Sequence, residues 1–151
     1  MKSTVADIPI NKHLGISYDE QTNSLSLPDT DQAKNHFGQV SFCAQFTLAE
    51  AASAQFMFEQ LGMNLEQDIP TLRTINTNFY KPINGHSICN LISLEHSKEQ
   101  FQNLLNQKGK ISTSVQVEVV SSEGTRSLVG NFQWLVLRRP KEPQPRTEAD
   151  S

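Results

Sequence analysis

The stretch that most constrains the fold is residues 45–58, the longest run in the chain that is rich in helix-forming residues and free of Gly and Pro. Phe46, Ala49 and Ser53 recur along it at helical spacing and would lie on one face of a helix. Further apolar residues extend the apolar surface beyond that face. A helix of this kind is covered on most sides, so we predict that it is central to the domain. Among its small residues lies one carboxylate, Glu50, whose burial is costly unless it has partners or a function.

Length and composition fit one soluble domain. The chain has 151 residues and a formal net charge of −3, which is long enough for one hydrophobic core. Lys and Arg are scattered until the C-terminal region, so we expect no nucleic-acid partner. No stretch approaches the ~20 apolar residues of a membrane span and the N-terminus lacks a signal-peptide pattern, so we predict a cytoplasmic protein without a membrane partner. The two cysteines and four histidines show no metal-binding spacing, and we expect no metal and no disulfide.

The first part of the chain predicts a short hairpin and a loop. Residues 16–18 and 25–27 alternate apolar and polar side chains and are separated by polar turn residues, a pattern typical of two paired strands. Residues 30–40 are polar and contain Gly38, which predicts a surface loop leading to the helix. Gly62 follows the helical stretch and is the predicted helix end.

Strands dominate the region after the helix. Residues 64–70 form a polar link, and residues 71–80 and 87–95 are rich in strand-forming types. The pair Asn84 and Gly85 lies between these two stretches, and Asn-Gly is the strongest short hairpin signal in a sequence. We therefore predict that residues 71–80 and 87–95 pair as a hairpin.

The last part of the chain has the clearest strand pattern. Residues 96–107 predict a short irregular helix, and residues 111–119 and 127–137 alternate regularly and are joined by a turn, so these two strands should pair.

The predicted order is a hairpin, one long helix and four antiparallel strands in sequence. We place one domain at 1–139 and a disordered tail, rich in Pro and charge, at 140–151. One helix covers only one face of such a sheet, which predicts a homodimer.

Four segments of the chain carry a family pattern: residues 8–16, 35–50, 80–82 and 84–85. They resemble the hotdog-fold thioesterases, and within them the group similar to phenylacetyl-CoA thioesterase. The active-site segment of that family reads Asn-x-x-Gly-x-x-His-Gly-Gly, followed by a helix with Leu-Ala-Asp or Leu-Ala-Glu, and Asn35, Gly38 and Glu50 fall on matching positions. The resemblance implies an α+β hotdog fold, in which an antiparallel sheet of five or six strands wraps around one long central helix.

The resemblance also implies a reaction, the hydrolysis of an acyl-CoA thioester. Such a reaction needs a base or nucleophile near the carbonyl carbon and hydrogen-bond donors for the oxygen that becomes negative. Glu50 would activate water or attack directly as a catalytic residue, and Asn35 would hold the carbonyl or the water as the second one. Ser53, three residues after Glu50, would bind substrate or orient the water. From spacing alone, a Glu such as Glu50 is more often an exposed or ion-paired residue of a helix, and Asn35 a turn or cap residue.

The backbone N–H groups of Phe42 and Cys43, at the helix N-terminus, are the expected oxyanion donors. We place both residues, with Gly38, among the substrate-binding positions. The family's His-Gly-Gly is replaced here by Ser41, Phe42 and Cys43, and side chains in place of Gly narrow the approach of an acyl-CoA. The alternative function is therefore a hotdog dimer that binds an acyl or aromatic ligand without chemistry. A thiol nucleophile formed by Cys43 and His36 has no defined geometry, and a small buried thiol is the simpler interpretation.

As an enzyme, the protein is expected to work as a homodimer or a tetramer of dimers. No separate cofactor is implied, since coenzyme A enters as part of the substrate.

Overall fold

The structure, a computed structural model, describes residues 5–140. Apart from Pro140, the tail predicted at 140–151 therefore lies outside the described residues. In chain order the elements are η1 (Val5–Asp7), α1 (Pro9–His13), β1 (Ser17–Asp19), β2 (Ser24–Leu27), η2 (Asp31–Ala33), α2 (Phe42–Gln60), β3 (Asp68–Phe79), β4 (Ser87–Leu94), α3 (Lys98–Lys108), β5 (Lys110–Ser121) and β6 (Arg126–Arg138).

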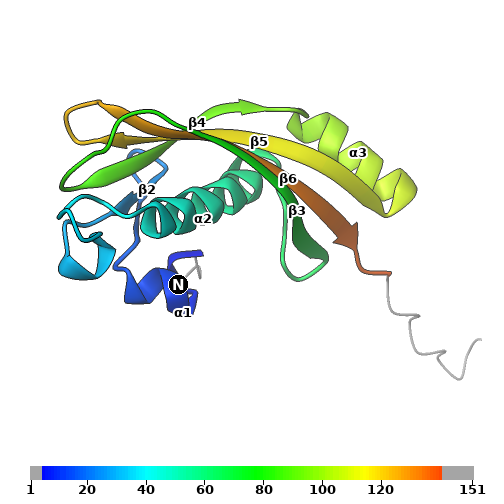
Figure 1. Ribbon diagram of the computed structural model, residues 1–151. Coiled ribbons are helices and arrows are strands. Elements are labelled where there is room, and N and C mark those ends of the chain that lie inside the picture. Colours follow the sequence, from blue (N-terminus) through cyan, green and yellow to red (C-terminus); the bar gives the residue numbers. More distant parts are fainter. Residues whose placement is uncertain (1–4, 141–151) are drawn as a thin grey trace, which may run out of the picture.

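The predicted architecture of a sheet wrapped around one long helix is confirmed. Six strands form one antiparallel sheet in the order β1-β2-β4-β5-β6-β3. The sheet arches over α2, and α1 lies on the side of α2 that faces away from the sheet (Figure 1). None of the described helices is long and apolar enough to cross a bilayer.

Helix α2 begins three residues before the predicted stretch because Ser41 caps it. The Oγ of Ser41 accepts a hydrogen bond of 3.1 Å from the N–H of Ala44, which is the usual way of pairing one of the free donors at a helix start. The side of α2 that meets the sheet carries small and aliphatic residues, and Leu48, Ala49 and Met57 are 0% exposed. These residues make the core of the domain continuous from the helix to the sheet.

The hairpin predicted between residues 71–80 and 87–95 is wrong. Strand β3 pairs with β6, whereas β4 lies between β2 and β5. The connecting segment, residues 80–86, passes around the turn of the β5–β6 hairpin: the N–H of Tyr80 bonds to Ser127 O on one side, and the N–H of Ser122 bonds to His86 O on the other. The Asn-Gly pair therefore lies in a crossover between opposite parts of the sheet, where a two-residue turn would have been too short.

Helix α3 is regular and not irregular as predicted. Ser97 and Gln100 form a reciprocal capping box at its start, and Gly109 ends it with a φ of 70°, a left-handed conformation that favours Gly. Its inner residues Phe101 and Leu105 are buried. The helix thereby covers the end of the sheet that lies beyond α2 (Figure 1).

A buried ion pair joins the start of β3 to the end of β6. The Asp68 side chain is 0% exposed and accepts hydrogen bonds from the Nε of Arg138 at 2.9 Å and from its Nη2 at 3.3 Å. The N–H of Asn64 donates a third bond of 3.0 Å to Asp68. Arg138 also donates to Asn106 and Gln102 of α3. Asp68 lies within the polar link predicted at 64–70 and is the first residue of β3. Through Arg138 it joins β3 to β6 and α3.

Candidate active site at the start of α2

The loop before α2 is shaped by Asn35. Its Oδ1 accepts hydrogen bonds from the N–H groups of Phe37 at 2.9 Å and Gln39 at 3.0 Å, and its carbonyl accepts one from Gly38 at 3.0 Å. Gly38 has a φ of 75°, which explains why this position favours Gly. The side-chain Nδ2 of Asn35 donates to no described residue and stays available for a ligand.

Two backbone donors are free at the helix start. Ala44 donates to the Oγ of Ser41 and Gln45 to the carbonyl of Ser41, but the N–H groups of Phe42 and Cys43 have no acceptor among the described residues. Free N–H groups at a helix N-terminus attract negative charge. The arrangement is chemically suited to stabilise an oxygen that becomes negative.

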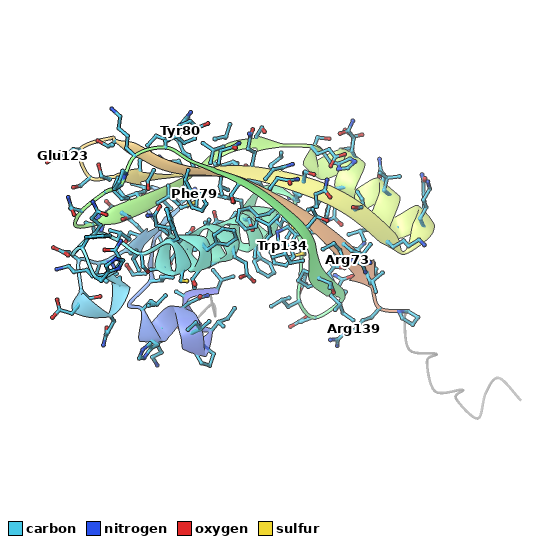
Figure 2. All side chains as sticks on the ribbon, viewed as in Figure 1. Arg73, Phe79, Tyr80, Glu123, Trp134 and Arg139 are labelled. Carbon is cyan, nitrogen blue, oxygen red and sulfur yellow. The ribbon has the colours of Figure 1, made fainter. Side chains whose placement is uncertain are left out.

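Phe42 lies against the end of β3 instead of entering the core. Its ring is 4.1 Å from the ring of Phe79, centroid to centroid, and its side chain is 57% exposed. Figure 2 shows Phe79 pointing toward α2 while Tyr80 points to the opposite face of the sheet. Phe42 is thus one wall of the space in front of the helix, and it leaves that space open.

A hollow of about 340 Å³ lies beside the helix start. Its lining combines apolar side chains with a few polar ones: Asn35, His36, Phe37, Gln39, Val40, Phe42, Gln45 and Pro82. Two of the predicted site residues, Asn35 and Phe42, are therefore brought together around one space. Gly38 shapes the loop beside it, and Cys43 is exposed next to Phe42.

Glu50 is exposed, so its charge carries no cost of burial. The helical period explains this, because Cys43, Phe46 and Glu50 follow one another at i, i+3 and i+7 along a side of α2 that is only partly covered, with Phe46 packed against Phe79 and Phe132 of the sheet. No described residue binds the carboxylate. Seven residues of helix correspond to about 10 Å along the axis, so within one chain Glu50 is separated from the free N–H groups by two turns.

Ser53 lies in the core. It is 0% exposed, donates a hydrogen bond of 2.7 Å to the carbonyl of Glu50 and accepts one of 3.0 Å from the Nε1 of Trp134. Trp134 extends from β6 toward α2 in Figure 2. The hydroxyl of Ser53 is thus engaged by the protein itself, and the geometry gives it a part in joining α2 to β6 and not in orienting a water.

Sequence reasoning missed Gln45. This residue lines the hollow and is only 1% exposed. The available signal was its helical spacing, since Gln45 precedes Ala49, Ala52 and Phe56 on the buried side of α2. An amide at a core position requires partners, and the sequence alone does not show whether it has them.

The two thiols are in different environments. Cys43 is exposed, whereas Cys89 is buried in the sheet. Burial raises the pKa of the Cys89 thiol well above its usual range. Cys89 is therefore a small apolar core residue, as a cysteine in such a place usually is.

The fold is that of known thioesterases. A probable thioesterase from Pseudomonas aeruginosa superposes with a TM-score of 0.75 at 15% identity, over 89% of this chain and 91% of that chain. A thioesterase from Haemophilus influenzae gives 0.65 at 16% identity, over 93% and 90%, and a Bacillus halodurans protein solved with CoA gives 0.63 at 16%, over 89% and 86%. No family model and no curated protein matches the sequence. The chain therefore has the hotdog fold predicted from its sequence.

Proposed function

We propose that this protein is an acyl-CoA thioesterase whose active site lies at the start of α2. The observation that carries the proposal is the pair of free N–H groups of Phe42 and Cys43 beside a partly apolar hollow, with the free Nδ2 of Asn35 at its lining. These groups match what a thioester carbonyl needs when its oxygen becomes negative. The fold, which this chain shares with a thioesterase and with a protein solved with CoA, supports the same function.

In the proposed reaction, Glu50 takes a proton from a water molecule. The water oxygen forms a bond to the carbonyl carbon, and the carbonyl oxygen becomes negative against the N–H groups of Phe42 and Cys43. The carbon–sulfur bond then breaks as the carbonyl re-forms. The thiolate of coenzyme A leaves and takes up the proton that Glu50 had accepted, which restores the carboxylate, and the acyl group leaves as a carboxylic acid.

A second copy of the chain would supply the carboxylate. Within one chain Glu50 is two helical turns from the oxyanion donors, but β3 is an edge strand with β6 as its one described neighbour. Pairing of two β3 strands about a two-fold axis would place the outer sides of the two α2 helices next to each other in opposite directions. Glu50 of one copy would then approach the helix start of the other.

The direct test is the release of free thiol from a panel of acyl-CoA substrates of different chain lengths and ring contents. We expect turnover of at least one short or aromatic member without added metal. Wild-type protein that is inert across the whole panel, although folded, would refute the proposed function.

The alternative is a dimer that binds an acyl or aromatic ligand without chemistry. The observation in its favour is that two exposed side chains occupy the helix start where the resembling family has Gly. Phe42 is 57% exposed, and Cys43 is exposed beside it. Both side chains restrict how a thioester approaches the N–H groups.

We expect the double variant Phe42→Gly, Cys43→Gly to separate the two functions. If the two side chains block an otherwise complete site, wild type binds acyl-CoA without hydrolysing it, and the variant releases free thiol. If wild type already turns over, opening the site raises KM through lost contact with Phe42 more than it changes kcat. Thermal shifts with the same acyl-CoA panel measure binding in parallel, and binding by both proteins with turnover by neither supports the alternative.

A further inference from the structure

The hollow beside α2 has an apolar rim and a polar residue at its floor. Its most buried lining residues are Gln45, 1% exposed, and Val40, 7% exposed. Phe37 and Phe42, by contrast, are 74% and 57% exposed and form the mouth together with His36 and Pro82. A ligand in the hollow therefore lies against Gln45 at the most buried part of the lining.

The amide of Gln45 is only half satisfied. Its Nε2 donates a hydrogen bond of 3.2 Å to the carbonyl of Val40. This bond identifies the nitrogen end of the amide, because a flipped amide would place its oxygen against the carbonyl oxygen of Val40. Its Oε1 is buried and receives a hydrogen bond from no described residue. A buried acceptor without a donor is costly, and in native structures it calls for an explanation.

Gln55 on the same helix provides the contrast. It is also buried, 8% exposed, yet both ends of its amide have protein partners: the Oε1 accepts from Val5 N at 3.4 Å, and the Nε2 donates to Glu59 at 3.0 Å. Gln55 is thus explained by the fold. Gln45 differs in having a free acceptor and in lining a hollow.

We propose that the hollow is the acyl pocket and that Gln45 selects an acyl group carrying a hydroxyl or N–H donor, an inference that rests on the proposed thioesterase function. The terminal torsion of a Gln side chain is soft, so a small rotation of the amide turns Oε1 toward such a donor. A volume of about 340 Å³ is at the lower end for ligand sites and fits a short chain or a single ring. The Nδ2 of Asn35 provides the complementary donor for the thioester carbonyl.

The test compares matched pairs of substrates that differ by one hydroxyl group: butyryl-CoA with hydroxybutyryl-CoA, and phenylpropanoyl-CoA with its ring-hydroxylated form. We expect kcat/KM to favour the hydroxylated member of at least one pair by about 10- to 100-fold, the usual effect of a buried polar group that loses its partner. Gln45→Met, which keeps the side-chain shape, should abolish the preference. Gln55→Met, the same change on the same helix, should retain it.

A binding measurement on non-hydrolysable thioethers, S-butyl-CoA and S-hydroxybutyl-CoA, with the corresponding phenylpropyl pair, separates this inference from the proposed function. If the protein turns over both members of each pair equally and binds the paired thioethers equally, the role of Gln45 is refuted but the proposed thioesterase function is not. Preferential binding of a hydroxylated thioether by a protein that turns nothing over would overturn the thioesterase and retain the role of Gln45. Since the comparison within each pair uses wild-type protein, it decides the matter even if Gln45→Met does not fold.

Discussion

Replacing Glu50 with Gln is expected to lower kcat for acyl-CoA hydrolysis by about 100-fold or more, because the amide cannot take the proton from water. The fold should be unaffected, since the side chain is exposed and no described residue binds it. The measurement is the steady-state rate of thiol release, with thermal unfolding as a check. Glu66→Gln, a change at another exposed carboxylate, is the matched control and should leave kcat unchanged.

Mixing two inactive variants tests where the carboxylate comes from. If each site combines Asn35 of one copy with Glu50 of the other, a mixed dimer of Glu50→Gln and Asn35→Ala contains one intact site. Random exchange of subunits should then restore about a quarter of the wild-type activity, as the symmetry of a two-fold dimer requires. If the subunits are shown to exchange and no activity returns, the whole site lies within one chain.

The second large effect is expected on stability. Asp68→Asn should lower the free energy of unfolding by about 3–5 kcal/mol, the usual result of removing one partner of a buried ion pair. The Asp68 side chain is 0% exposed and that of Arg138 only 17%, so the mostly buried guanidinium would keep its bonds to Asn106 and Gln102 but lose the carboxylate that compensates its charge. Urea unfolding followed by circular dichroism measures the change.

Asp31→Asn provides the comparison for Asp68. Asp31 also forms an ion pair, 3.7 Å from Lys34, but its side chain is fully exposed, and water replaces such a partner at little cost. Its unfolding midpoint should equal that of wild type. An equally small effect at Asp68 would mean that the bonds from Arg138 to Asn106 and Gln102 hold the three elements together without the carboxylate.

The predictions that succeeded rest on local signals. A run without Gly or Pro marked α2, and strict alternation marked β5 and β6, because each pattern reports on the burial of neighbouring residues. The pairing of β3 depends on contacts between residues as distant as Asp68 and Arg138, which no local pattern reports. The Asn84-Gly85 signal was misleading for the same reason, since a turn-forming pair is also compatible with a crossover.

The candidate site was predicted in part. Spacing located the loop of Asn35 and the start of α2, because the positions of a loop, a cap and a helix follow one another in the sequence. It did not show which side of α2 remains open. The helical period fixes Gln45 and Glu50 on different sides, but only the position of the sheet decides that Gln45 is buried and Glu50 exposed.

The order of the strands has a consequence for how the chain folds. Strands β4, β5 and β6 are consecutive neighbours and can pair as soon as they are made, whereas β3 precedes them and must wait for β6, the last strand of the described chain. Non-local pairing of this kind is slow compared with hairpin formation. The free edge that would meet a second copy in the proposed dimer is thus completed last, so that association through it would have to wait until synthesis has passed β6.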